Sequence, residues 1–105
     1  INNRKPKLFT NIGGLSGPAI KPIAIANVYK IYKKVSIPII GIGGISSADD
    51  VIEFILAGAE MVQIGTSNYA NPNIGVEICN HLVKYCKKYN VKKISDLKGN
   101  IDFHE

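Results

Sequence analysis

Two short apolar runs, each ending in glycine, constrain the fold of this chain more than any other feature. They are "SIPIIGIG" (36–43) and "MVQIGT" (61–66), and both are rich in aliphatic residues. The first run shows no alternation of apolar with polar residues, which is typical of a strand covered on both faces in a parallel sheet. We therefore expect two short, parallel strands.

Helical patterns lie before, between and after these runs. Apolar residues recur at helical spacing from about Pro22 to Lys34. Between the strands, Ser46 or Ser47 can cap a helix, and the spacings Ser46 to Asp49 and Ser47 to Asp50 resemble capping boxes. That helix is expected to end at Gly58 and to turn four side chains inward: Val51, Ile52, Ile55 and Leu56.

After the second strand, "SNYANP" is interpreted as a loop in which Asn71 and Pro72 form the cap and first turn of the next helix. A last short helix is expected from Ser95 to Lys98, followed by a frayed tail. The resulting order of helix, strand, helix, strand, helix predicts an α/β fold with a parallel sheet and helices outside it.

Two strands are too few to form a stable sheet of this kind. This shortage, the start at Ile1 and the loop-like "INNRKPKLFTN" favour a fragment of a longer protein.

The glycines at the strand ends indicate a binding site. Gly43 and Gly44 follow the first strand, and Gly65 and Thr66 follow the second, so parallel pairing would bring both pairs to the same rim. Backbone N–H groups without an obstructing Cβ can hold a phosphate dianion, and the Thr66 hydroxyl could donate one more bond. The alternative interpretation is that these glycines only permit tight turns between strand and helix.

Composition excludes several classes of protein. The 105 residues are 46% hydrophobic and 20% charged, as in globular proteins, and no apolar run approaches the roughly 20 residues that cross a bilayer. We expect a cytoplasmic protein. The net charge of +5 comes from scattered lysines, so nucleic-acid binding is not expected. Cys79 and Cys86 are too far apart on one helix for a disulfide, and no metal-ligand spacing is present.

Three stretches together resemble the C-terminal third of class 1 dihydroorotate dehydrogenases, which are flavin enzymes of pyrimidine synthesis. The stretches are "GGLSGPAIKPIA", "IPIIGIGGISSADDVIEFILAGAEMVQIGT" and "NYANP". The resemblance implies that residues 1–105 form the C-terminal portion of a (β/α)8 TIM barrel, about the last two βα units and the preceding helix. "SGPAIKP" and "GTSNYANP" are similar to the NAD-linked type B catalytic subunit, whereas "MVQIGT" also occurs in the fumarate-using type.

The resemblance also implies a cofactor and partners. It assigns FMN contacts, chiefly to the phosphate and the ribityl chain, to the positions Gly17, Gly43, Gly44, Gly65 and Thr66. The parent enzyme would be a homodimer, joined in type B by a subunit that carries FAD and an iron-sulfur cluster. Its substrate would be dihydroorotate, oxidised to orotate in the de novo synthesis of UMP.

The resemblance implies no catalytic residue in this chain, because it places the family's cysteine base and the groups that hold orotate on segments upstream of the matching part. His81 and His104 are interpreted as surface residues. Lys21 either faces the rim near the cofactor or faces solvent. Two rivals remain: a fragment of the flavin domain of a dihydropyrimidine dehydrogenase, and a small phosphate-binding protein without catalysis.

Overall fold

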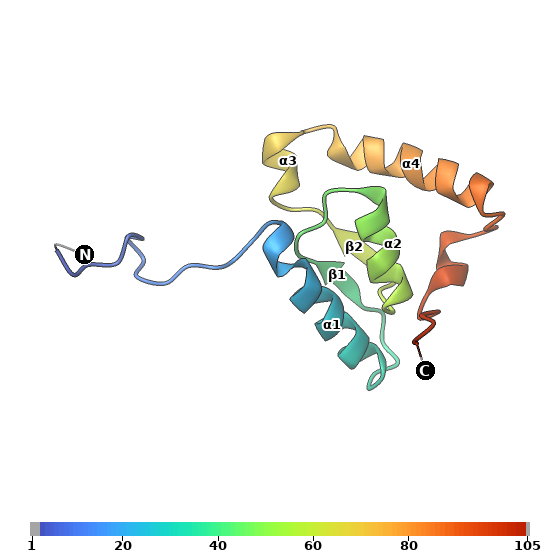
Figure 1. The fold of residues 1–105 in the computed structure, drawn as a ribbon, viewed down its shortest axis with the longest axis horizontal. Helices are drawn as coiled ribbons and strands as arrows, with labels where there is room; N and C mark the ends of the chain where they lie inside the picture. Colours follow the sequence, from blue (N-terminus) through green and yellow to red (C-terminus); the bar gives the residue numbers. More distant parts are fainter. Residues whose placement is uncertain (1–2, 105) are drawn as a thin grey trace.

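The computed structural model describes residues 3–104 of the chain. Figure 1 shows two central strands with helices packed beside them and a long segment that leads to the first helix. The elements are η1 (Pro18–Ile20), α1 (Lys21–Tyr32), β1 (Ile40–Ile42), α2 (Ala48–Leu56), β2 (Met61–Gln63), α3 (Ser67–Ala70), α4 (Ile74–Lys88) and η2 (Ile94–Leu97). Apart from the short α3, this is the predicted alternation of helix and strand.

The two strands pair in parallel, with Ile40 opposite Met61 and Ile42 opposite Gln63. A parallel pair needs a crossover connection, and α2 supplies it between the end of β1 and the start of β2. Both strands therefore end at the same edge of the sheet, as the sequence predicts. Each is only three residues long, shorter than the apolar runs that contain them, since each has a single hydrogen-bonded neighbour among the described residues.

The core lies between this sheet and the helices. Phe54 of α2 is fully buried, and it lies directly over Gly41 of β1. Val51, Ile52 and Ile55 are buried as predicted, whereas Leu56 is only half-buried and the buried Phe54 was not predicted. Other buried members of the core cluster come from α1, the loop after β1 and α4: Val28, Ile45 and Ile78.

The other face of the sheet is exposed in the described part of the chain. Ile40, Ile42 and Met61 have 48%, 55% and 55% of their surface exposed, and successive strand residues point to opposite faces. The prediction of strands covered on both faces is therefore met here only on the side of the helices. The exposed apolar side is the one that further strands and side chains would cover in a closed barrel.

Several helix boundaries differ from the prediction, most clearly those between β2 and α4. The segment interpreted as a loop contains the single-turn helix α3, and α4 begins two residues later than expected. Asn71 does not cap α4. Its Oδ1 instead accepts from the Asn73 backbone N–H at 3.0 Å, and its carbonyl accepts from the Ile74 N–H at 3.1 Å, which forms a turn that precedes the helix.

The predicted frayed tail is wrong for the residues after η2. The Gly99 N–H donates to the Ile55 carbonyl at 3.1 Å, and the Phe103 ring packs against Tyr29 with 5.4 Å between the ring centroids. Tyr32 fits closely against Gly58 and Gly99, both of which have positive φ. The C-terminal segment is thus held against α1 and α2.

At the other end of the chain, residues 3–16 form no helix or strand, and most of this segment extends away from the packed elements in Figure 1. This agrees with the loop-like composition of the segment, although Ile1 itself lies outside the described residues. No helix in the described part of the chain is long and apolar enough to cross a membrane.

The contact between Gly41 and Phe54 generates a first prediction. A Cβ at position 41 would lie 2.4 Å from Cδ1 of Phe54, so Gly41→Ala should destabilise the fold by roughly 1–3 kcal/mol. Gly14→Ala is the control, because Gly14 lies in no helix or strand and no atom beyond its chain neighbours lies within 4 Å of an added Cβ. Urea unfolding followed by circular dichroism measures both. A Gly41→Ala protein as stable as the control would show that the Phe54 ring yields at little cost.

Candidate functional site

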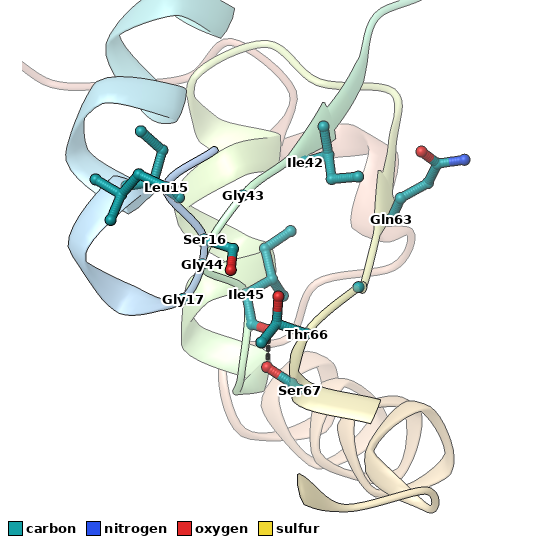
Figure 2. Close-up of a pocket in the computed structure, with 12 residues that line it drawn as sticks. Leu15, Ser16, Gly17, Ile42, Gly43, Gly44, Ile45, Gln63, Thr66 and Ser67 are labelled. Carbon is teal, nitrogen blue, oxygen red and sulfur yellow. Dashed lines mark hydrogen bonds between the residues drawn. The ribbon is translucent and has the colours of Figure 1, made fainter. Parts of the chain in front are cut away.

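A cavity of about 320 Å³ lies at the edge of the sheet where both strands end. Three segments form it: the stretch before α1, the loop after β1 and the loop after β2 (Figure 2). All five residues that the sequence analysis names line it: Gly17, Gly43, Gly44, Gly65 and Thr66. Residues that are 48 positions apart along the sequence, from 17 to 65, are thus brought together.

Gly43 and Gly44 are required by the packing of the chain itself. Their φ values are 123° and 75°, in the region that favours glycine. A Cβ on Gly44 would lie 2.7 Å from the Gly17 carbonyl oxygen and 2.8 Å from Cβ of Lys21. The interpretation that these glycines permit a tight turn is therefore correct for both, whatever else they do. In this turn, Gly44 of the loop after β1 packs directly against Gly17 and Lys21, at the start of η1 and α1.

Gly65 differs from these two glycines. It is exposed, its φ lies outside the left-handed region, and no atom of the described chain lies within 4 Å of a Cβ built on it. Neither a strained turn nor a close internal contact accounts for glycine at this position. What glycine provides at position 65 is an open approach from the cavity to the backbone.

Several backbone donors at the cavity remain available. Within residues 3–104, the N–H groups of Gly44, Gly65 and Thr66 donate in none of the turn and loop hydrogen bonds. The Thr66 side chain makes no capping bond to α3. Figure 2 shows the Thr66 hydroxyl on the cavity side of its loop, with Ser16 across from it on the stretch before α1. Residues that line one cavity and carry N–H and O–H groups without such a partner suit an anion.

The loops after the two strands are tied to each other. The Ser67 hydroxyl, at the start of α3, donates to the Ile45 carbonyl at 2.7 Å. This is the dashed contact in Figure 2. It fixes the distance between the loop that carries Gly43 and Gly44 and the loop that carries Gly65.

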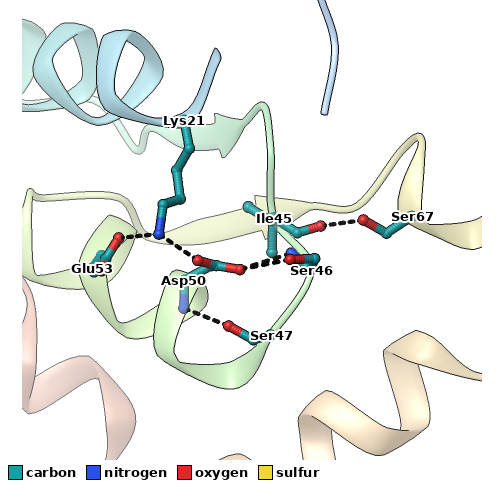
Figure 3. Close-up of polar contacts among 7 residues, drawn as sticks. All are labelled: Lys21, Ile45, Ser46, Ser47, Asp50, Glu53 and Ser67. Atoms are coloured by element: carbon teal, nitrogen blue, oxygen red, sulfur yellow. Dashed lines mark hydrogen bonds and ion pairs between the residues drawn. The ribbon is translucent and has the colours of Figure 1, made fainter. Parts of the chain in front are cut away.

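An ion pair links the start of α1 to α2 (Figure 3). The Lys21 ammonium is 2.5 Å from Oδ1 of Asp50 and 2.8 Å from Oε2 of Glu53. Lys21 is not among the residues that line the cavity, and its side chain is only 24% exposed. Neither alternative considered for Lys21, the rim beside the ligand or free solvent, describes this position.

Asp50 is the centre of this polar cluster. Its Oδ2 accepts from the Ser46 backbone N–H at 2.9 Å and from the Ser46 hydroxyl at 3.1 Å. Its own N–H donates to Oγ of Ser47, which is the N-cap of α2. The predicted cap by Ser47 is confirmed, but the carboxylate reaches back to Ser46 and not to the N-cap amide of a standard capping box.

These contacts shift the pKa values of the Asp50 carboxyl and the Lys21 ammonium group. Burial by itself would raise the pKa of Asp50, but the bonds from Lys21, Ser46 and Ser47 outweigh it and lower the pKa to about 2. The hydrogen bonds to Asp50 and Glu53 raise the pKa of Lys21 in turn. Both groups are therefore ionised across the neutral pH range.

Other candidate residues lie away from the cavity. His81 and His104 are exposed, as expected, and Cys79 and Cys86 are free thiols on α4. In residues 3–104 there is no cluster of three or more His, Cys, Asp or Glu that could hold a metal ion.

The remaining residues of the cavity wall were not predicted as site residues. Ile42 and Gln63 could have been found, because they are the last strand residues before the named glycines. Nothing local marks the other five, whose positions depend on how the three segments pack: Leu15, Ser16, Ile20, Ile45 and Ser67.

The lowered pKa of Asp50 generates a second prediction. A carboxylate whose pKa falls from 3.8 to about 2 on folding contributes about 2 kcal/mol of stability above pH 4 or so. This contribution is lost as the pH falls from about 4 towards 2. Asp50→Asn should therefore be less stable than the parent near pH 6, and the difference should shrink in acid. Urea unfolding from pH 2 to pH 6 or so measures the stability of both proteins, and Asp49→Asn is the control because Asp49 is exposed. A stability difference between parent and Asp50→Asn that stays constant with pH would contradict the prediction.

Comparison with known proteins now identifies the family. A model of the dihydroorotate dehydrogenase family matches residues 1–85. The catalytic subunit of dihydroorotate dehydrogenase B (NAD(+)) from Malacoplasma penetrans is 56% identical over 95 residues, which is 90% of this chain and 31% of that protein. The subunit of the same name from Oceanobacillus iheyensis is 50% identical over 97 residues, 92% of this chain and 32% of that protein. The chain spans about a third of the length of these relatives.

Solved structures agree with the sequence comparisons. A DHODH from Eimeria tenella in complex with ferulenol superposes with a TM-score of 0.78 at 26% identity, over 90% of this chain and 26% of that one. Its ligand-free form gives the same TM-score at 30% identity, over 84% and 25% of the two chains. The parallel α/β piece described above is therefore part of a TIM barrel. The chain belongs to the dihydroorotate dehydrogenase family of flavin-dependent oxidoreductases.

Proposed function

We propose that this chain is the C-terminal, FMN phosphate-binding part of a dihydroorotate dehydrogenase that oxidises dihydroorotate to orotate in pyrimidine synthesis. The observation that carries the proposal is the cavity at the strand ends. The five positions assigned to FMN by the resemblance all line it, although they come from three separate segments.

The residues of the cavity fit the phosphate end of a flavin nucleotide. Gly65 leaves its backbone open, and the free N–H groups of Gly44, Gly65 and Thr66 can each donate to a phosphoryl oxygen. Apolar side chains such as Leu15 and Ile42 lie in the same wall and suit the apolar ring surface of the nucleotide better than its hydroxylated ribityl chain. Lys21 does not contribute a free charge, because two carboxylates already bind it.

The role of these residues in the reaction is to bind and to orient. FMN, when bound, supplies a ring that accepts a hydride from the substrate. The described residues of the cavity wall include no carboxylate, histidine, lysine or cysteine, so this part of the site offers no group that would take up a proton. The proton acceptor of the proposed reaction belongs to the rest of the enzyme. Fixing the phosphate fixes where the ring can lie, which is the contribution of this chain.

The proposal extends to partners. The relatives named above are catalytic subunits of dihydroorotate dehydrogenase B (NAD(+)), a name that implies at least one further subunit. We assign this chain to the same NAD-linked type, acting as a homodimer with a subunit that carries FAD and an iron-sulfur cluster. The two rivals, a dihydropyrimidine dehydrogenase fragment and a small phosphate-binding protein, find no support in the family match.

A chimera tests the proposal in a full-length enzyme. This chain replaces the matching segment of the Malacoplasma penetrans subunit, to which it is 56% identical. The purified chimera should bind FMN, with quenching of flavin fluorescence, and should oxidise dihydroorotate in the presence of a dye acceptor. A folded chimera that binds no FMN would refute the proposal.

Gly65→Ala is the informative variant in this chimera. The added Cβ meets no atom of the described chain, so the melting temperature should stay within a degree or two of the parent. A methyl group between the amide and the phosphate should weaken FMN binding about tenfold or more. Riboflavin, which lacks the phosphate, should bind equally to both proteins. Gly14→Ala is the matched control, since its Cβ is also unobstructed and Gly14 does not line the cavity. Equal FMN affinity in Gly65→Ala and parent would place the phosphate elsewhere.

A further inference from the structure

Three segments form the cavity, and none of them is held in place by the sheet alone. Gly17 lies before η1, Gly44 follows β1 and Gly65 follows β2, all outside the regular elements. The N–H groups of such loops can converge on one anion only if something fixes the loops relative to one another. The bond from Ser67 to Ile45 does this for two of the loops. The stretch before α1 needs a separate connection.

Lys21 provides that connection. It begins α1, four residues after Gly17, and its Cβ and backbone N–H lie against Gly44, at 2.8 and 3.1 Å from a Cβ built there. Its ammonium then reaches across to Asp50 and Glu53 on α2 (Figure 3). One side chain thus contacts both the loop after β1 and the helix that follows it.

Asp50 completes the connection on the other side. Its second carboxylate oxygen accepts from the backbone N–H and the hydroxyl of Ser46, the residue directly after Ile45. The contacts therefore run from Lys21 through Asp50 to Ser46, and from Ile45 to Ser67. Asp50 is buried, with 7% of its surface exposed, and a buried charge-assisted bond of this kind holds its partners in one geometry.

We propose that the Lys21–Asp50 ion pair is a positioning device for phosphate binding: it holds the stretch containing Gly17 against the loop containing Gly44, so that their backbone groups face the same anion. Lys21 acts through the backbone and does not itself touch the phosphate. This inference rests on the proposed function. It makes the affinity for the phosphate depend also on Lys21 and Asp50, which do not line the cavity.

Two opposite charge changes separate positioning from simple electrostatic attraction. Lys21→Met removes a cation near the site, and Asp50→Asn removes an anion, so a long-range charge effect would weaken FMN binding in the first and strengthen it in the second. Loss of positioning weakens binding in both. We expect each variant, in the chimera described above, to lose about tenfold in FMN affinity, the typical effect of one lost charge-assisted bond.

Riboflavin and two further variants complete the test. Riboflavin affinity should change less than twofold in Lys21→Met and Asp50→Asn, because only the phosphate depends on the positioned amides. Lys21→Arg should recover most of the FMN affinity, since it can keep the ion pair. Glu53→Gln should lose less FMN affinity than Asp50→Asn, because the Glu53 side chain is 48% exposed, binds Lys21 but not Ser46, and does not line the cavity.

Three outcomes would overturn the positioning role of the Lys21–Asp50 ion pair. Opposite effects of Lys21→Met and Asp50→Asn, or equal losses for FMN and riboflavin, would overturn the positioning role. Unchanged FMN affinity in both variants would overturn it as well. If Lys21→Met does not fold, the comparison of Asp50→Asn with Lys21→Arg still decides. A chimera in which Gly65→Ala weakens FMN binding while both ion-pair variants bind normally would refute this inference and leave the proposed function standing.

Discussion

The parallel pairing of β1 with β2 is the constraint on which the rest of this structure depends. Because both strands run in the same direction, their last residues, Ile42 and Gln63, lie side by side at one edge of the sheet. The loops that leave these strands must begin at that edge, and they form two of the three walls of the cavity. An antiparallel pair would have put residues 43 and 65 at opposite ends, and no common site could have formed.

Local patterns predicted most of the elements and the centre of the site. Apolar periodicity located α1, α2 and α4, and the glycines that follow each strand led to Gly43, Gly44 and Gly65. These signals are readable because each depends on residues within one or two turns of one another. The same patterns were weak at boundaries. Asn71 followed by proline has the composition of a helix cap, yet the chain uses it in a turn between α3 and α4.

The features that were missed depend on contacts between distant segments. Lys21 and Asp50 are 29 residues apart, and nothing near either one in the sequence indicates that they meet. Phe54 is fully buried because Gly41 leaves room for its ring, which can be known only once strand and helix are packed. Likewise, the polar composition of the C-terminal segment favours fraying, whereas Gly99 and Phe103 are held by Ile55 and Tyr29. The family resemblance supplied the cofactor, which no local pattern could name.

The exposed side of the strand pair has a consequence for handling residues 1–105 as a separate polypeptide. Ile40, Ile42 and Met61 form a small apolar surface beside strand edges whose hydrogen-bonding groups have no neighbour in the described part of the chain. Surfaces and edges of this kind pair readily with a second copy of the same chain. A preparation of residues 1–105 alone is therefore prone to aggregate, whereas neighbouring strands would cover the same surface in a complete barrel.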